Sequence, residues 1–170
     1  LTGKTTSPGN VLSVWTMQDA ERVEKLAGAA HDIIVIGGGL IGLQVADALY
    51  RKKHIKLTIV ESLGQILSRN IDADCAEIVQ EEMQSQGVTI LCRANVTGIE
   101  KRGKKAAVIL DSGRELIGDM VIINIGVEAN AGWLRGGGIK VNRGVVIDEF
   151  MHATFDNIFA AGDVTEVTNI

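Results

Sequence analysis

The sequence has 170 residues, of which 46% are hydrophobic, 22% charged and only 4% aromatic. This length and composition indicate about one folded domain with an aliphatic core, and they argue against a disordered chain. The net charge of −4 argues against a nucleic-acid-binding surface, and no apolar run approaches the roughly 20 residues that a membrane-spanning helix needs.

The N-terminal part is predicted to contain a connector followed by a boundary helix. Glycine, serine and proline within residues 1–14 indicate the connector. The helix should begin at Thr16, with Asp19 in the capping-box position three residues later. Its buried face is expected to contain residues at helical spacing, namely Ala20, Val23, Leu26, Ala27 and Ala30.

A series of strands alternating with helices follows. Short β-branched runs ended by glycine or a charged residue predict buried strands, and longer periodic runs predict helices. The expected order is a strand at 32–36, a helix to about 53, a strand at 54–60, a helix at 72–86 and a strand at 88–91. In the second helix Ala76, Ile78, Val79 and Met83 should face the core. Such alternation implies right-handed crossovers and a parallel sheet.

The pattern then changes to short strands separated by hairpin signals. Runs at 96–100, 105–110 and 114–117 are divided by Arg102-Gly103-Lys104 and by Asp111-Ser112-Gly113. A buried strand returns at 120–123, and short extended pieces are expected at 145–147 and 158–161. The predicted fold class is therefore α/β, a Rossmann-like parallel sheet with an inserted antiparallel β-meander.

Three glycines after the strand at 32–36 form a dinucleotide-binding pattern. Gly37-x-Gly39-x-x-Gly42 follows a strand and opens a helix, as the dinucleotide fingerprint requires. Gly37 permits a tight turn, Gly39 presents no side chain to the pyrophosphate, and Gly42 lets helix and strand approach. The helix N-terminus offers free amides to the phosphate oxygens. A ligand-free glycine turn is the alternative interpretation of this motif.

An acidic residue stands where such a site would bind the adenosine ribose. Glu61 ends the second strand, 19 residues beyond Gly42. Its carboxylate would also repel a 2′-phosphate, and residues 62–65 include no lysine or arginine. We therefore predict NAD(H) rather than NADP(H). Arg69 is the next base along the chain, and its return to the ribose would weaken this prediction.

Four segments carry a resemblance that covers nearly the whole chain from Val11 onward. They are residues 34–43 (IVIGGGLIGL), 71–74 (IDAD), 125–130 (IGVEAN) and 154–164 (TFDNIFAAGDV). On these segments the sequence resembles the pyridine nucleotide–disulfide oxidoreductase family. The glycine turn is similar to the family's NAD-binding turn, and the last segment is similar to the one that places an aspartate against the flavin. A plain Rossmann dehydrogenase has no reason to carry that last segment.

The resemblance implies cofactors and binding residues. NAD(H) would bind the glycine turn with its pyrophosphate and Glu61 with its adenine ribose, while Val96 would line the adenine pocket. Gly126 would let the backbone approach the cofactor, and Asp163 would accept a hydrogen bond from the ribityl chain of FAD. The candidate cofactor-binding residues are Gly37, Gly38, Gly39, Leu40, Ile41, Gly42, Glu61, Ser62, Val96, Gly126, Gly162 and Asp163.

Two positions depart from the family pattern. Gln44 stands where the family usually has a glutamate near the nicotinamide, so it keeps a hydrogen-bonding carbonyl and loses the charge. Ala129 replaces the proline that often precedes the loop asparagine, here Asn130. That loop should therefore be less rigid than in other members.

The resemblance also predicts how the chain is organised. Residues 1–30 would form the connector and boundary helix, 31–147 the NAD-binding domain, and 148–170 a tail of a discontinuous FAD-binding domain. The chain would be the NAD-binding middle of a flavoenzyme, presenting NADH for hydride transfer to flavin. A stand-alone NAD-sensing module without catalysis is the main alternative, and a methyltransferase-like domain is a weaker one.

No residue of the sequence is assigned to acid–base or nucleophilic catalysis. His31, His54 and His152 stand apart from any cysteine, and Cys75 and Cys92 form neither a redox pair nor a metal-ligating cluster. We therefore expect no metal site and no turnover by the isolated chain. Two isolated cysteines, interpreted as packing residues, indicate a reducing, cytoplasmic compartment. The expected partners are a dinucleotide and the rest of the flavoenzyme chain. The sequence leaves the electron acceptor open among a disulfide, oxygen, peroxide and a protein.

Overall fold

A computed structural model describes residues 9–167. The chain divides into two compact units, the first ending at Gly126 and the second beginning at Val127. In the described part of the chain, no helix combines the length and the apolar character needed to cross a bilayer.

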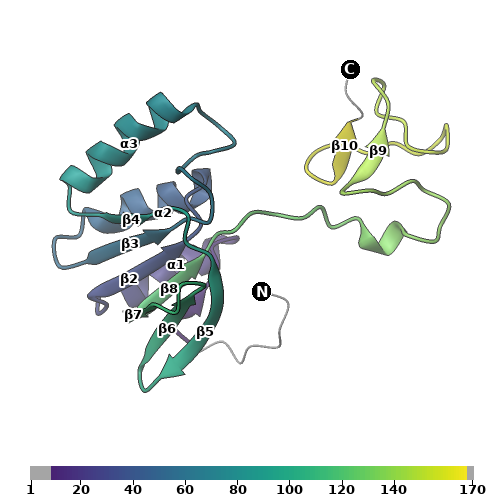
Figure 1. The fold of residues 1–170 in the computed structure, drawn as a ribbon. Coiled ribbons are helices and arrows are strands. Elements are labelled where there is room, and N and C mark those ends of the chain that lie inside the picture. The colour runs from purple at the N-terminus through teal and green to yellow at the C-terminus, as the bar shows by residue number, and fades with distance from the viewer. Residues whose placement is uncertain (1–8, 168–170) are drawn as a thin grey trace. The chain divides into compact units, whose positions relative to one another are not determined.

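The first unit is built on a five-stranded parallel sheet with the order β1-β8-β2-β3-β4 (Figure 1). Its strands are β1 (Val11–Leu12), β2 (Asp32–Ile36), β3 (Lys56–Val60), β4 (Thr89–Leu91) and β8 (Met120–Ile123). Because β2 is flanked by β3 on one side and β8 on the other, the strand order reverses at the carboxyl end of β2. Open α/β sheets bind their ligands at this kind of switch point.

Three helices accompany this sheet: α1 (Met17–Ala27), α2 (Leu40–Tyr50) and α3 (Ala73–Ser85). The capping box predicted for α1 is confirmed, since Thr16 accepts from the amide of Asp19 and the Asp19 carboxylate accepts from the amide of Thr16. Asp72 caps α3 in a similar way by accepting from the amide of Cys75 at 2.9 Å.

Alternate residues of β2 face two different cores. Ile33 and Val35 pack with side chains from all three helices. Ile34 and Ile36 pack with the inserted antiparallel sheet, which consists of β5 (Val96–Arg102), β6 (Lys105–Leu110) and β7 (Glu115–Gly118). A strand covered on both faces needs apolar residues at successive positions, as this one has. The predicted fold class, a Rossmann-like sheet with an inserted antiparallel meander, is confirmed.

Some details of the first unit differ from the sequence prediction. Val11 and Leu12, expected in the connector, pair with β8 as β1. Ala20 and Ile78, expected to face the core, are exposed, Ile78 at 68%. Helical spacing gives the direction of a buried face, and the width of the covered stripe depends on what packs there.

The second unit has little regular structure. It contains a short 3-10 turn, Gly132–Leu134, and two parallel strands, β9 (Val145–Ile147) and β10 (Thr165–Val167). Its small core centres on Ala131, Val145 and Ile147. The extended piece expected at 158–161 is reduced to one bridge between His152 and Phe159. The two compact units divide after Gly126, whereas the boundary predicted at residue 147 separates two cofactor-binding domains and stays a prediction.

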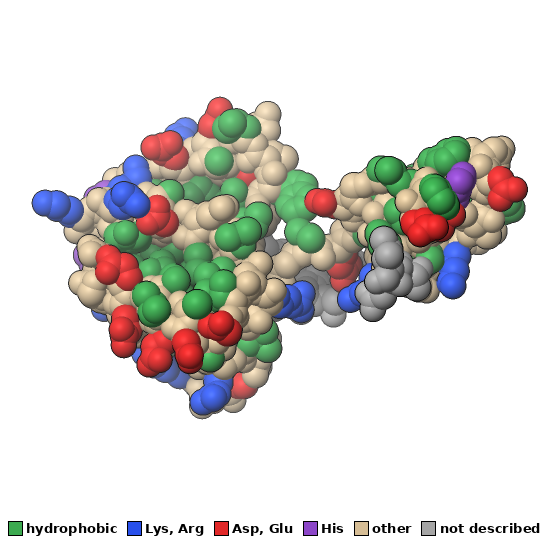
Figure 2. All heavy atoms as spheres, turned by 90° about the horizontal axis from the view of Figure 1, so that it is seen from above, with side chains coloured by type: hydrophobic (Ala, Val, Ile, Leu, Met, Phe, Trp, Pro, Cys, Tyr) green, Lys and Arg blue, Asp and Glu red, His purple; other side chains and the backbone are tan. Residues whose placement is uncertain are grey.

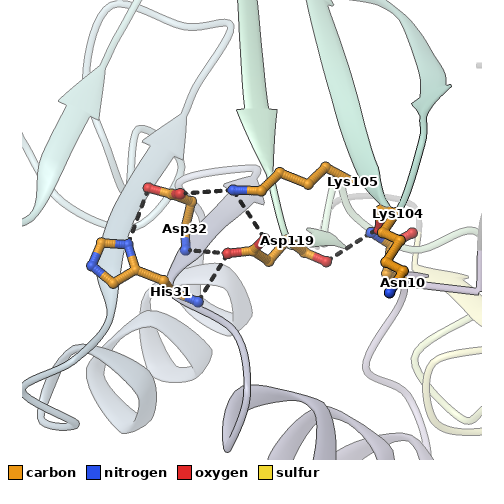
Figure 3. A network of polar contacts seen from close by, with 6 residues as sticks. All are labelled: Asn10, His31, Asp32, Lys104, Lys105 and Asp119. Carbon is orange, nitrogen blue, oxygen red and sulfur yellow. Dashed lines mark hydrogen bonds and ion pairs between the residues drawn. The ribbon is translucent and has the colours of Figure 1, made fainter.

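A polar network joins the inserted sheet to the amino ends of the parallel strands (Figure 3). Lys105, the first residue of β6, lies 3.1 Å from Asp32 and 3.0 Å from Asp119. Asp119 also accepts the amides of Asp32 and His31, at 2.9 and 3.0 Å. The bond from the Asp32 amide, more than the other partners, lowers the pKa of the Asp119 carboxyl.

We expect Asp119→Asn to reduce the free energy of unfolding by about 1 kcal/mol at pH 7, a value kept small because solvent screens the pair. The lowered pKa means that this contribution is present above the ordinary range of an aspartate and is lost as the pH falls below it. Urea unfolding between pH 7 and pH 3 should show the two proteins converging at low pH. Glu21→Gln, on the exposed face of α1, is the control; equal losses in both variants would contradict the role of Asp119.

Candidate functional site

The glycine turn lies where the carboxyl end of β2 meets the start of α2. Gly37 has φ +105°, and a Cβ added there would overlap the carbonyl oxygen of Asn124, at the end of β8. A Cβ on Gly42 would overlap the carbonyl oxygen of Gly37. The turn is therefore closed by backbone packed directly on backbone, and neither position has room for a side chain.

Gly39 differs from these two glycines because it faces open space. No atom lies within 4 Å of a Cβ built on it. Gly39 is the N-cap of α2, and no side chain caps the first turn of that helix. The first amides of a helix have no partner within the helix, and no side chain of the described residues takes that place in α2. The arrangement can accept an anion.

Glu61 is tied to the glycine turn by direct hydrogen bonds. Its side chain is only 9% exposed, and one carboxylate oxygen accepts the amide of Gly38 at 2.7 Å. The other oxygen accepts the amide of Leu63 at 2.8 Å and the hydroxyl of Ser62 at 3.2 Å. A carboxylate has about four lone-pair sites, so roughly one stays available to a ligand such as a ribose hydroxyl. The amide of Gly38 is directed at Glu61.

The remaining predicted residues of the first unit lie in β5, in the segment after β8 and in the first turn of α2. Val96 begins β5 and is half-buried against the core below the inserted sheet. Gly126, two residues beyond Asn124, has φ +112° and nothing within 4 Å of a Cβ. Large hydrophobic side chains remain on the surface of this unit, as the green spheres in Figure 2 show. They include Leu40 and Ile41, 54% and 47% exposed, in the first turn of α2.

Gly162 and Asp163 belong to the second unit. Gly162 has φ +81°, and its carbonyl accepts the amide and the hydroxyl of Thr165, at 3.0 and 2.8 Å. Asp163 is exposed. The backbone therefore turns sharply at Gly162 and presents the next carboxylate to the surface.

Two residues near the glycine turn were not predicted from the sequence. The backbone carbonyl of Asn124 lies next to Gly37, and the side-chain nitrogen of Asn124 is buried without an acceptor among the described residues. Arg93 follows β4, and its guanidinium lies against Gly64, 3.6 to 3.7 Å from where a Cβ of Gly64 would stand. The only signal for Arg93 was its place after a parallel strand, since such strands end at one edge of the sheet.

The sequence profile of the pyridine nucleotide-disulphide oxidoreductase family matches residues 2–170. Among curated proteins, the chain is 30% identical over 155 residues to the ferredoxin–NAD(+) reductase component of a 3-phenylpropionate/cinnamic acid dioxygenase from Photorhabdus laumondii, covering 91% of this chain and 39% of the relative. It is 27% identical to a rubredoxin–NAD(+) reductase from Ectopseudomonas oleovorans, covering 91% of this chain and 40% of the relative.

A solved structure gives the same result. The covalent putidaredoxin reductase–putidaredoxin complex superposes with a TM-score of 0.87 at 29% identity, covering 95% of this chain and 40% of the reductase chain. The chain thus spans about two fifths of the length of these relatives. The expected cofactors, NAD(H) and FAD, are confirmed at the level of the family.

Proposed function

This chain belongs to the pyridine nucleotide-disulphide oxidoreductase family, and from that premise we propose that it is the NAD(H)-binding part of an FAD-dependent oxidoreductase. In that role it holds NADH so that a hydride can pass to a flavin. The family profile supports an oxidoreductase flavoprotein with a Rossmann-type nucleotide domain.

The observation that carries the proposal is the opening at Gly39. No atom lies within 4 Å of a Cβ at Gly39, and the first turn of α2 that begins there has no side-chain cap, so we assign the diphosphate to this place. A Cβ on Gly37 or on Gly42 would overlap backbone atoms, so this close-packed turn requires glycine at both positions. The site therefore offers a preformed anion cradle at the switch point of the sheet.

Glu61 gives the site its adenosine end. Its carboxylate orients the turn through Gly38 and keeps room for one further donor, which we assign to a ribose hydroxyl. Val96, on the neighbouring inserted sheet, and Ser62 complete this end in the proposal. At the other end of the dinucleotide, Gly126 and the exposed side chains of Leu40 and Ile41 supply a surface without charge for the nicotinamide.

The flavin contact belongs to the second unit. FAD, when bound, accepts the hydride that NADH supplies. We assign Gly162 and Asp163 to its binding, since the sharp backbone turn leaves the Asp163 carboxylate at the surface as an acceptor for a hydroxyl. The rest of the flavoenzyme chain would be the main partner of this surface.

Both cysteines are free thiols, in keeping with the proposed cytoplasmic location.

The proposal is tested by titrating the 170-residue chain with NADH while following coenzyme fluorescence, together with a visible absorption spectrum. We expect weak but saturable binding of NADH, weaker binding of NADPH, no bound flavin and no turnover. Absence of saturable NADH binding would refute the nucleotide site, and stoichiometric FAD would refute the division of roles. The alternative, a stand-alone NAD-sensing module, predicts NADH binding without any flavin in the complete protein.

A further inference from the structure

Arg93 lies at the same sheet edge as Glu61, although 32 positions separate them in the sequence. The cause is the register of β3 and β4, in which Val60 pairs with Leu91. The amide of Glu61 donates to the carbonyl of Leu91 at 2.8 Å, and the amide of Arg93 donates to the carbonyl of Leu63 at 2.9 Å. The two loops are therefore fixed to each other through the main chain.

The guanidinium of Arg93 lies over a position that lacks a side chain. Its Nε and Nη2 atoms stand 3.6 and 3.7 Å from where a Cβ of Gly64 would be. Arg93 is exposed, and no carboxylate of residues 9–167 forms an ion pair with it. Its backbone has φ +54°, a conformation that costs a non-glycine residue about 1 kcal/mol or more. Within residues 9–167, Arg93 thus has a strained backbone and unpaired guanidinium donors, and it lies beside the loop that follows Glu61.

The charge of Glu61 is partly compensated at the same place. Two amides and one hydroxyl already donate to its carboxylate. Its repulsion of an incoming anion is therefore weaker than that of a free, exposed glutamate. The prediction that this loop excludes a 2′-phosphate rested on the Glu61 carboxylate and on the absence of a base in residues 62–65. The structure brings a base, Arg93, to this loop from the segment after β4.

We infer that Arg93 is a selectivity-determining residue that binds the 2′-phosphate of NADPH, so that this site accepts NADPH as well as NADH. The inference rests on the proposed nucleotide-binding function. A guanidinium can donate two parallel hydrogen bonds to a phosphate, and Arg93 is exposed beside Gly64. Glu61 still makes the affinity for NADH higher, because its carboxylate accepts from the ribose hydroxyl. Arg93 reduces the difference between the affinities for NADH and NADPH.

The test compares dissociation constants for NADH and NADPH in the wild-type chain and in Arg93→Gln. The wild type should bind NADPH within about tenfold of NADH, since one charge-assisted contact is worth about that factor. Arg93→Gln should weaken NADPH about tenfold and leave NADH within about twofold. In Arg93→Gln, adenosine 2′,5′-bisphosphate should compete less well with NADH for the site, in parallel with the weaker binding of NADPH. Adenosine 5′-monophosphate should compete with NADH as well as it does in the wild type.

Two further variants make the result specific. Arg69→Gln removes an exposed positive charge from the same loop region and should leave the dissociation constants of NADH and NADPH unchanged. Arg93→Gly removes the guanidinium and also relieves the positive φ, so it should fold at least as well as the wild type and show the same loss of NADPH.

The possible failures are distinguishable. Equal weakening of NADH, NADPH and adenosine 5′-monophosphate in Arg93→Gln would mean that Arg93 contacts the adenine, and it would overturn the inference. The inference would also be overturned if Arg69→Gln weakened NADPH binding and Arg93→Gln had no effect on it. If the wild type binds neither coenzyme, the proposed function itself fails.

Discussion

Replacing Gly42 by alanine should destabilise the first unit by about 3 kcal/mol, although Gly→Ala inside a helix ordinarily stabilises by roughly 0.5–1 kcal/mol. The sign reverses because the added methyl group would overlap the carbonyl oxygen of Gly37, which is backbone and cannot rotate away. Gly37 cannot move either, since its own Cα faces the carbonyl of Asn124. Relief therefore requires α2 to separate from the end of β2.

The measurement is urea unfolding followed by far-ultraviolet circular dichroism. All described α-helices lie in the first unit, so the helical signal reports that unit. Gly39→Ala is the matched control, because the same methyl group meets nothing within 4 Å there. Gly39→Ala should change the unfolding midpoint little. A Gly42→Ala protein as stable as Gly39→Ala would show that helix and strand are not packed as described.

The parts of the fold that the sequence predicted correctly depend on local signals. The alternation of strands and helices, the capping box at Thr16 and Asp19, and the hairpins of the inserted sheet are each decided by residues a few positions apart. Short β-branched strands ended by glycine need no distant partner to be recognised. The family resemblance added the expected cofactors and the roles of the candidate binding residues.

The features that were missed depend on pairing between distant segments. Val11 and Leu12 carry too short a pattern to predict a strand, and β1 exists because β8 offers an edge to pair with. Ile78 follows helical spacing yet stays 68% exposed, since the core that covers Ala76 and Met83 does not extend to it. Neither outcome is encoded in the neighbouring residues.

The candidate site shows the same division. The steric need for glycine at positions 37 and 42 follows from the motif and agrees with the geometry. The bond from the Gly38 amide to Glu61 and the approach of Arg93 to Gly64 depend on the register between β2, β3 and β4. A one-residue shift in that register would move the side chains of Glu61 and Arg93 toward the other face of the sheet. Sequence reasoning therefore anticipated the proposed phosphate end of the candidate site more completely than its proposed adenosine end.

Replacing Gly39 by valine should weaken NADH binding by about 100-fold or more while leaving the fold intact. Gly39 has φ −79° and ψ −177°, extended backbone that a valine adopts readily, and there is open space for its side chain. In the proposal that space is where the diphosphate meets the first amides of α2. A branched side chain there would displace the phosphate and forfeit hydrogen bonds to charged oxygens, each worth about 1.5–3 kcal/mol.

The measurement is the dissociation constant of NADH, with the unfolding midpoint recorded for the same protein. Loss of the N-cap glycine should cost no more than about 1 kcal/mol of stability. Ala48→Val, an exposed position further along α2, controls for placing a β-branched residue in this helix and should bind NADH normally. If Gly39→Val bound NADH as tightly as Ala48→Val, the diphosphate could not lie over Gly39. Because a Cβ at Gly37 or Gly42 would already overlap backbone atoms, Gly39 is the position of this motif with open space, and the anion site would then have to be sought away from the N-terminus of α2.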